Sequence, residues 1–229
     1  MGVGLMGRIV CFEGCDGSGK STQVNLFINH LRGTNISYRY IHYPTQTTVY
    51  GKLIQDYLFN RGDIAEMGEI NPYFIATLYA NDRYRMKPVI DKWVDEMDIV
   101  ILDRYVYSNY ALIGGQLDDF NDCGLLSDRD TFFDWLGRYE FEKNKLQVPD
   151  IVLYLNIPLK FIKEHLEKRD SQDIHENLQV QRNAKEVYDN MVDDFTTFSV
   201  ECSKNGLLLS EEDIHNNIID LLKDRNIIE

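Results

Sequence analysis

The stretch "RIVCFEGCDGSGKST", from Arg8 to Thr22, determines the fold of this 229-residue chain. Arg8 to Glu13 is an apolar run that predicts a buried strand, and a segment of helical period follows from Lys20 to Leu31. Between them, Gly14 to Ser21 fits the spacing G-x-x-x-x-G-K-S/T in full. Glycines let backbone N–H groups curl around phosphate oxygens, and the helix directs its positive end toward them. We therefore expect a nucleotide-binding phosphate loop.

The polar residues of this loop have separate expected roles. Lys20 is expected to reach the β and γ phosphates of ATP, and Ser21 to ligate the Mg²⁺ that accompanies ATP. The predicted ATP-binding residues are Gly14, Gly17, Ser18, Gly19, Lys20, Ser21 and Thr22.

The rest of the chain alternates apolar runs with segments of helical period. Further strands are predicted at Ser37–Pro44, Asp98–Asp103, Asp150–Pro158 and, short and last, Gly206–Ser210. Helices are predicted at Tyr50–Phe59, Asn71–Met97 (kinked or divided at Pro88), Leu159–Lys168, Gln179–Phe198 and Glu211–Leu222. This alternation predicts an α/β fold in which helices cover both faces of a parallel sheet, with ligands at the carboxyl ends of its strands. We expect one domain over residues 1–229, with 1–7 as a disordered lead-in.

The charge and cysteine content exclude several classes of partner. The net charge is −13, so generic binding to nucleic acid or anionic lipid is not expected. No apolar run approaches the length of a membrane span. The four cysteines form no C-x-x-C pair, which argues against a zinc site and favours free thiols in a cytoplasmic protein.

Phosphate loops occur in switches, motors and kinases, so the loop alone does not decide the function. A guanine-nucleotide switch would carry an Asn-Lys-x-Asp stretch on a late strand, where this chain has "YLNIPLK". A motor would need more chain. A small kinase needs the loop, an acceptor pocket with arginines and a lid, and this class fits best.

Four further stretches support a kinase: "HYP" (His42 to Pro44), "LYANDR" (Leu78 to Arg83), "DRYVYSNYAL" (Asp103 to Leu112) and "DIHE" (Asp173 to Glu176). Together with "FEGCDGSGKSTQ", they resemble the thymidylate kinase family over Phe12 to roughly Tyr188. The resemblance implies the P-loop kinase fold with a short lid, phosphoryl transfer from ATP to dTMP with Mg²⁺, and a homodimer.

The resemblance also suggests which residues bind the acceptor. Asp16 corresponds to the carboxylate that faces the acceptor 3′-hydroxyl, and Tyr43 to an aromatic wall of the cleft. Tyr79 takes the place of the ring that stacks on thymine, and Asn109 lies where some members contact the thymine edge. The predicted dTMP-binding residues are Asp16, Tyr43, Tyr79, Arg83, Arg104 and Asn109.

Elementary chemistry supports several of these roles. The guanidinium groups of Arg83 and Arg104 can each grip a phosphate bidentately, although an ion pair with a neighbouring acid is the commoner state of an arginine such as Arg83. Asp103 ends the strand Asp98–Asp103, where a Mg²⁺-associated carboxylate is expected beside Ser21. Lys20, Arg104 and Asp16 are expected to act in catalysis.

The chain departs from the family pattern at several positions. No arginine adjoins Pro44, Leu112 replaces a tyrosine of some members, and residues 113–131 have no counterpart. Gly17 stands where some members carry a catalytic arginine, so we expect that charge to come from a lid at residues 169–176. Arg169 is the candidate for this catalytic role, and Arg182 is its competitor.

Two alternatives stay open at this point. A deoxynucleoside kinase of the same fold would phosphorylate an unphosphorylated nucleoside and would need a base, for which Glu13 is available. A non-catalytic nucleotide-binding switch would use ATP only for partner recognition.

Overall fold

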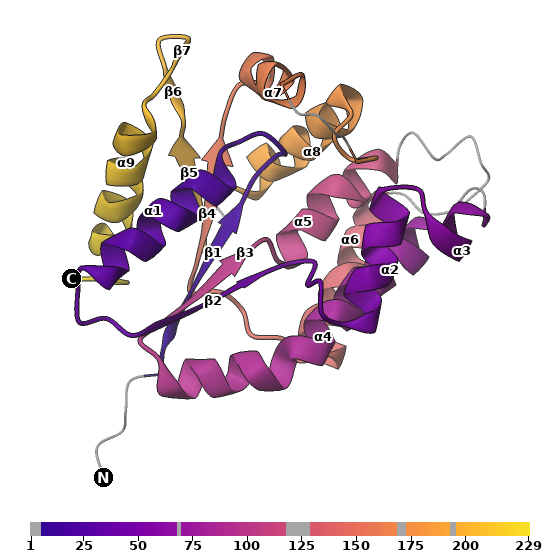
Figure 1. Ribbon diagram of the computed structural model, residues 1–229, viewed down its shortest axis with the longest axis horizontal. Helices are drawn as coiled ribbons and strands as arrows, with labels where there is room; N and C mark the ends of the chain where they lie inside the picture. Colours follow the sequence, from indigo (N-terminus) through magenta and orange to yellow (C-terminus); the bar gives the residue numbers. More distant parts are fainter. Residues whose placement is uncertain (1–5, 68–69, 118–128, 169–172, 193–195) are drawn as a thin grey trace.

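The computed structural model describes residues 6–67, 70–117, 129–168, 173–192 and 196–229. A five-stranded parallel sheet forms its centre (Figure 1), with strand order β2-β3-β1-β4-β5. The strands are β1 (Arg8–Glu13), β2 (Tyr38–His42), β3 (Ile99–Asp103), β4 (Ile151–Asn156) and β5 (Thr197–Glu201). The predicted α/β fold is confirmed.

Helices cover both faces of this sheet. The side chains of Val10 and Phe12 in β1 join one hydrophobic cluster, while those of Ile9 and Cys11 join another. This alternation follows from the period of two along a strand and buries the strand completely. Helices α1 (Lys20–Arg32) and α9 (Glu211–Asp224) pack against each other over the first cluster (Figure 1).

The remaining helices complete the two layers. Those of the second cluster are α2 (Val49–Leu58), α3 (Gly62–Ala65), α4 (Pro72–Glu96), α5 (Val106–Leu112) and α6 (Arg129–Gly137), which continues into the π-helix η2 (Arg138–Lys143). Helix α5 contributes to both clusters, because Ala111 and Leu112 belong to the first. Helices α7 (Leu159–Leu166) and α8 (Leu178–Met191) add side chains to the first cluster.

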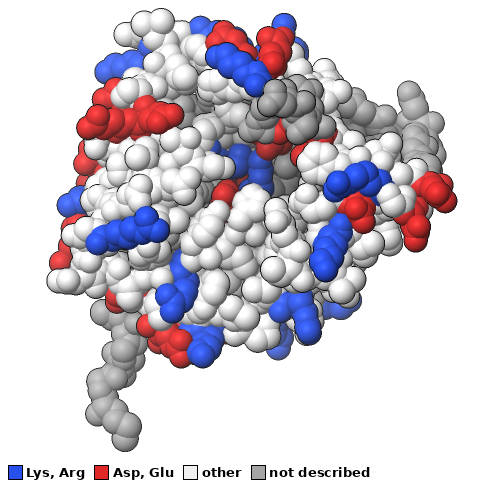
Figure 2. All heavy atoms as spheres, in the orientation of Figure 1, with Lys and Arg blue, Asp and Glu red and all other residues white. Residues whose placement is uncertain are grey.

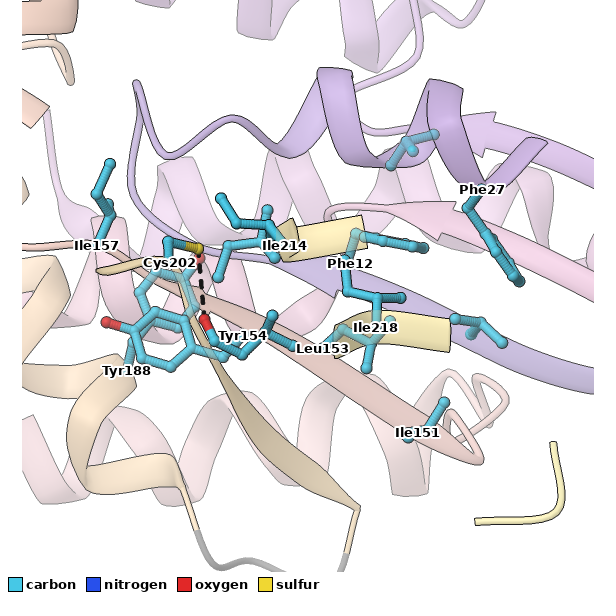
Figure 3. Close-up of a cluster of buried hydrophobic side chains, with 14 of the residues drawn as sticks. Phe12, Phe27, Ile151, Leu153, Tyr154, Ile157, Tyr188, Cys202, Ile214 and Ile218 are labelled. Carbon is cyan, nitrogen blue, oxygen red and sulfur yellow. Dashed lines mark hydrogen bonds between the residues drawn. The ribbon is translucent and has the colours of Figure 1, made fainter. Parts of the chain in front are cut away.

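Figure 3 shows the interior of the first cluster. The rings of Phe12 and Phe27 lie 5.8 Å apart between centroids, and Ile218 of α9 packs in the same cluster. Tyr154 of β4 stacks on Tyr188 of α8, with centroids 5.0 Å apart and an angle of 16° between planes. This stack fixes α8 against the sheet, and α8 carries residues that reach the phosphate loop.

The structure corrects three sequence-based predictions. The helix predicted at Gln179–Phe198 ends at Met191, and Thr197–Glu201 pairs with β4 as the fifth parallel strand. The strand predicted at Gly206–Ser210 is reduced to β7 (Leu207–Leu208), which pairs antiparallel with β6 (Ser203–Lys204) outside the main sheet. Pro88 does not divide α4, which runs without interruption from Pro72 to Glu96.

The register of the sheet aligns the carboxyl ends of β1, β2 and β3. Phe12 is paired with Asp103, and His42 is paired with the same Asp103. The phosphate loop that follows Glu13 therefore lies between the carboxyl ends of β3 and β4, with the end of β2 beyond β3. Within the described part of the chain, no helix has both the length and the apolar character needed to span a membrane.

Candidate active site

A cleft of about 530 Å³ opens at the carboxyl ends of these strands. Figure 2 shows a hollow in the middle of this face, with basic and acidic atoms on its floor. All the described residues predicted to bind ATP, dTMP or Mg²⁺ line the cleft except Gly14, which begins the loop. The lining members of that set are Asp16, Gly17, Ser18, Gly19, Lys20, Ser21, Thr22, Tyr43, Tyr79, Arg83, Asp103, Arg104 and Asn109. The fold thus brings them together, while their roles stay predictions.

The phosphate loop depends on glycine for its backbone path. Gly17 and Gly19 have φ angles of 77° and 87°, a left-handed region that residues with a side chain seldom adopt. Gly19 directly precedes α1, so the first N–H groups of that helix face the cleft. The loop therefore offers unpaired backbone donors and the positive end of a 13-residue helix to an anion.

Lys20 is held inside this loop. Its Nζ donates to the carbonyl oxygens of Gly14 at 2.8 Å and of Cys15 at 2.7 Å. Burial, followed by repulsion from Arg104, lowers the pKa of Lys20 to about 8, although Asp16 opposes the change. The ammonium is thus confined where phosphates of a bound nucleotide would meet it.

Arg104 adopts an unusual backbone conformation. Its φ is 66°, in the left-handed region, and its N–H donates to the Phe12 carbonyl oxygen at 3.0 Å. This conformation turns the side chain back toward the phosphate loop. There the guanidinium forms an ion pair with Asp16 and donates to the Gly14 carbonyl oxygen at 3.3 Å.

Asp16 is surrounded by groups that stabilise its charge. Burial by itself would raise its pKa, but Arg104 and Lys20 outweigh burial and lower the pKa to about 2. Gln181 adds two contacts, because its Nε2 donates to Asp16 Oδ2 at 2.9 Å and its Oε1 accepts from the Asp16 N–H at 2.7 Å. The carboxylate is charged at neutral pH and fixed in orientation.

Glu13 is fully buried and does not line the cleft. Its Oε1 accepts from the N–H groups of Tyr105 at 2.7 Å and Ser108 at 3.2 Å. Its Oε2 accepts from the hydroxyls of Ser108 at 2.7 Å and Tyr188 at 2.8 Å. Three of these donors anchor the start of α5, next to Arg104, and the fourth ties α8 to the same carboxylate.

Asp103 has one carboxylate oxygen engaged and one free. Oδ2 contacts His42 Nδ1 at 3.0 Å and accepts from the Tyr40 hydroxyl at 3.3 Å. Oδ1 is buried and makes no hydrogen bond to any described residue. Burial would raise the pKa of Asp103, but the contact with His42 lowers it overall. A charged oxygen without a partner, in the cleft beside Ser21, fits a Mg²⁺ site that uses few protein ligands and the nucleotide's own phosphates.

Arg83 has a partner that the sequence did not reveal. It is 1% exposed and forms an ion pair with Glu140 of η2, which is itself completely buried. Its Nε donates to the same Glu140 oxygen at 3.0 Å, and its Nη1 to the Tyr105 carbonyl oxygen at 3.2 Å. Three of the five guanidinium N–H donors are thus used, and two stay available at the cleft wall.

The other predicted acceptor residues form a mainly aromatic wall. Tyr43 and Tyr105 lie with ring centroids 5.9 Å apart, and burial raises the pKa of Tyr79 well above its ordinary value. Asn109 donates to the Ala76 carbonyl oxygen at 3.3 Å. This wall offers flat apolar surface with uncharged hydroxyls, which suits a nucleobase.

Sequence reasoning missed Gln181 and His175. Gln181 is completely buried, and its Nε2 links Asp16 to the His175 carbonyl oxygen, 2.6 Å away. The neighbouring Arg182, considered as a catalytic candidate, is exposed and does not line the cleft. The helical phase of α8, which buries Gln181, Ala184 and Val187, was the available signal. Arg169 and half of the predicted lid, residues 169–172, lie outside the described residues.

Comparison with known proteins agrees with this geometry. A family model described as thymidylate kinase matches residues 12–123. Protein 251L of Invertebrate iridescent virus 6, named as a thymidylate kinase, is 32% identical over 189 residues, which cover 82% of this chain and 76% of the viral one. The thymidylate kinase of Schizosaccharomyces pombe is 26% identical over 223 residues, covering 97% of this chain and 95% of its own.

A solved structure is similar in fold. The thymidylate kinase of Candida albicans superposes with a TM-score of 0.77, covering 98% of this chain and 94% of that chain at 24% identity. The fold match, the matched motifs and the extensive similarity to the viral relative lead to one conclusion. This chain belongs to the thymidylate kinase family.

Proposed function

We propose that the chain transfers the γ-phosphoryl group of ATP to dTMP and releases dTDP. The observation that carries the proposal is the convergence of Lys20, Arg104 and Asp16 in one cleft. Lys20 would neutralise charge on the donor phosphates, and Arg104 would hold the acceptor phosphate in line with them. Positioning and charge neutralisation are the main requirements of phosphoryl transfer.

Ser21 and Asp103 would hold Mg²⁺ together with the phosphates of ATP. Support comes from Asp103 Oδ1, which is buried without a hydrogen-bond partner among the described residues. When bound, the ion would offset the negative charge of the transferred phosphoryl group.

The acceptor would lie between Arg104 and the aromatic wall. Tyr79 would stack on thymine, Tyr43 would close the cleft beside Pro44, and Asn109 would face the base edge. Arg83 would offer its two remaining N–H donors, held in place by Glu140.

Steady-state release of ADP, measured with ATP and a panel of nucleosides and nucleoside monophosphates, tests this proposal. We expect dTMP to be the best acceptor and thymidine to be poor, because thymidine leaves the arginines without an anion. Faster turnover of thymidine than of dTMP would favour the deoxynucleoside kinase. Slow ATP hydrolysis at a rate that does not depend on any acceptor would favour the non-catalytic switch.

We also propose that Arg169, in the predicted lid, supplies the catalytic positive charge that some family members carry at the position of Gly17. Arg169→Ala and Arg182→Ala, measured in parallel, separate the candidates, because a transition-state arginine contributes roughly 10³–10⁵ in kcat. Wild-type kcat in the Arg169 variant would refute the assignment, and a large loss in the Arg182 variant alone would transfer the role.

A single catalytic domain, a homodimer and a cytoplasmic location complete the proposal. The family resemblance favours the dimer, and the acidic charge with free thiols favours the location. Light scattering on the purified protein measures its molar mass, and the mass of a monomer would refute the dimer.

A further inference from the structure

His175 has a buried polar atom without a partner. The residue is 6% exposed and lines the cleft, and its Nε2 makes no hydrogen bond to any residue that the structure describes. A buried nitrogen of this kind loses its hydration without compensation, which is costly unless a ligand supplies the missing bond. The cleft is the place from which such a ligand would come.

The surroundings of His175 hold the residue in one place. Its N–H donates to Asp173 Oδ1 at 2.8 Å, and its carbonyl oxygen accepts from Gln181 Nε2 at 2.6 Å. Its ring meets the Tyr57 ring edge-on, with centroids 5.9 Å apart. The same Gln181 amide donates to Asp16, so His175 is one hydrogen-bonding group away from the carboxylate of the phosphate loop.

The charges around the ring indicate what it would bind. Burial lowers the pKa of His175, although Asp173 and Asp16 oppose the change, so the imidazole is neutral at neutral pH. A neutral ring beside two carboxylates does not favour a phosphate dianion, for which Lys20 and Arg104 are available. A hydroxyl suits these surroundings, because it can donate its proton to a carboxylate and accept from an imidazole N–H. dTMP has a single hydroxyl, on the 3′ carbon of its sugar.

We infer that His175 is a specificity-determining residue whose Nε2 hydrogen-bonds the 3′-hydroxyl of the acceptor sugar. The inference rests on the proposed function. It adds a second contact to this hydroxyl, beside that expected from Asp16, from a side chain outside the phosphate loop that Gln181 holds in place.

The test pairs a change in the protein with a change in the substrate. In His175→Phe, the KM for dTMP should rise roughly fivefold to tenfold, the range of one lost neutral hydrogen bond, while the KM for ATP stays unchanged. With 3′-deoxythymidine monophosphate, which lacks the hydroxyl, wild type and His175→Phe should have the same KM. His175→Gln should retain most of the preference for dTMP over 3′-deoxythymidine monophosphate, because the glutamine amide reaches the position of Nε2. His175→Asn should lose this preference, because the asparagine side chain is shorter.

His215→Phe is the matched control. His215 also has a buried ring nitrogen without a partner among the described residues, but it lies on α9 and does not line the cleft. Both acceptors should keep their KM in this variant.

Several outcomes would overturn the inference. A rise in KM of equal size for both acceptors in His175→Phe would indicate a structural role, and an unchanged KM for dTMP would exclude the contact. If His175→Phe does not fold, the Gln and Asn variants replace it in the test. An equal preference for dTMP over 3′-deoxythymidine monophosphate in these two variants would also overturn the inference. A wild-type protein that does not phosphorylate dTMP would refute the proposed function instead, and is recognised before any variant is made.

Discussion

Replacing Glu13 with glutamine separates an anchoring role from a catalytic one. The carboxylate accepts four hydrogen bonds from Tyr105, Ser108 and Tyr188. In Glu13→Gln, the amide oxygen can keep the two N–H donors, and the amide NH₂ can meet the two hydroxyls, which rotate to accept. The contacts survive, but all four change from charge-assisted to neutral.

The magnitude follows from this change in type. A hydrogen bond to a charged group contributes about 1.5–3 kcal/mol and a neutral one about 0.5–1.5, so four bonds lose about 4 kcal/mol together. Relief from burying a carboxylate offsets part of this loss. We expect a net destabilisation of about 2 kcal/mol, which lowers Tm by roughly 4–8 °C in a chain of this size. The kcat of the folded enzyme should stay within about threefold of wild type.

Thermal unfolding followed by circular dichroism, together with ADP release at saturating dTMP, measures both quantities. Glu13→Leu is the comparison, because it leaves four buried donors without an acceptor and should not yield a folded protein. The opposite pattern would refute the anchoring role. An unchanged Tm with a loss of 10²-fold or more in kcat would identify Glu13 as a base, and a nucleoside as the acceptor.

Four other substitutions and one pH profile test the site and its supports. Lys20→Ala should remove turnover by at least 10²-fold with an unchanged circular dichroism spectrum, and near-native turnover would exclude the loop as the donor site. Because the pKa of Lys20 is lowered to about 8, the free enzyme loses this charge above pH 8, so kcat/KM for ATP should fall there. The same lowering makes the folding stability rise with pH between about 8 and 10.5. A kcat/KM that stays constant up to pH 10 would contradict the lowered pKa. Arg104→Ala should raise the KM for dTMP at least tenfold more than that for ATP, and the exposed Arg182→Ala should change neither. In Gly51→Ala, the added Cβ would lie 1.6 Å from a backbone oxygen, so a loss of more than about 2 kcal/mol is expected in denaturant unfolding, and wild-type stability would show that the loop can move aside.

The sequence predicted those elements whose patterns are local. The phosphate loop, α1 and β3 follow from residue spacing and a short apolar run, and the structure has them within a residue or two of the predicted bounds. Thr197–Glu201 could not be recognised in this way, because its half-buried pattern becomes a strand only through pairing with β4. Tertiary contact outweighs local propensity at such a segment.

The sequence predicts which residues line the site better than it predicts the hydrogen bonds and ion pairs between them. Arg83 is predicted to bind dTMP, but its partner Glu140 lies 57 residues away in a π-helix that no spacing predicts. The sequence offers both Gln181 and Arg182, and the rotational phase of α8 buries Gln181 and exposes Arg182. Long-range pairings of this kind depend on packing, which residue spacing does not encode.

The ion pair between Arg104 and Asp16 opposes the binding of simple anions in the cleft. Inorganic phosphate that draws the guanidinium away leaves a buried carboxylate unpaired, and that desolvation opposes its binding. Under the proposed function dTMP would compensate, because it would offer a phosphate to the arginine and a hydroxyl to the carboxylate in one molecule. The cleft should therefore resist competition from the free phosphate and chloride that surround it, and admit only a ligand that satisfies both halves of the broken pair.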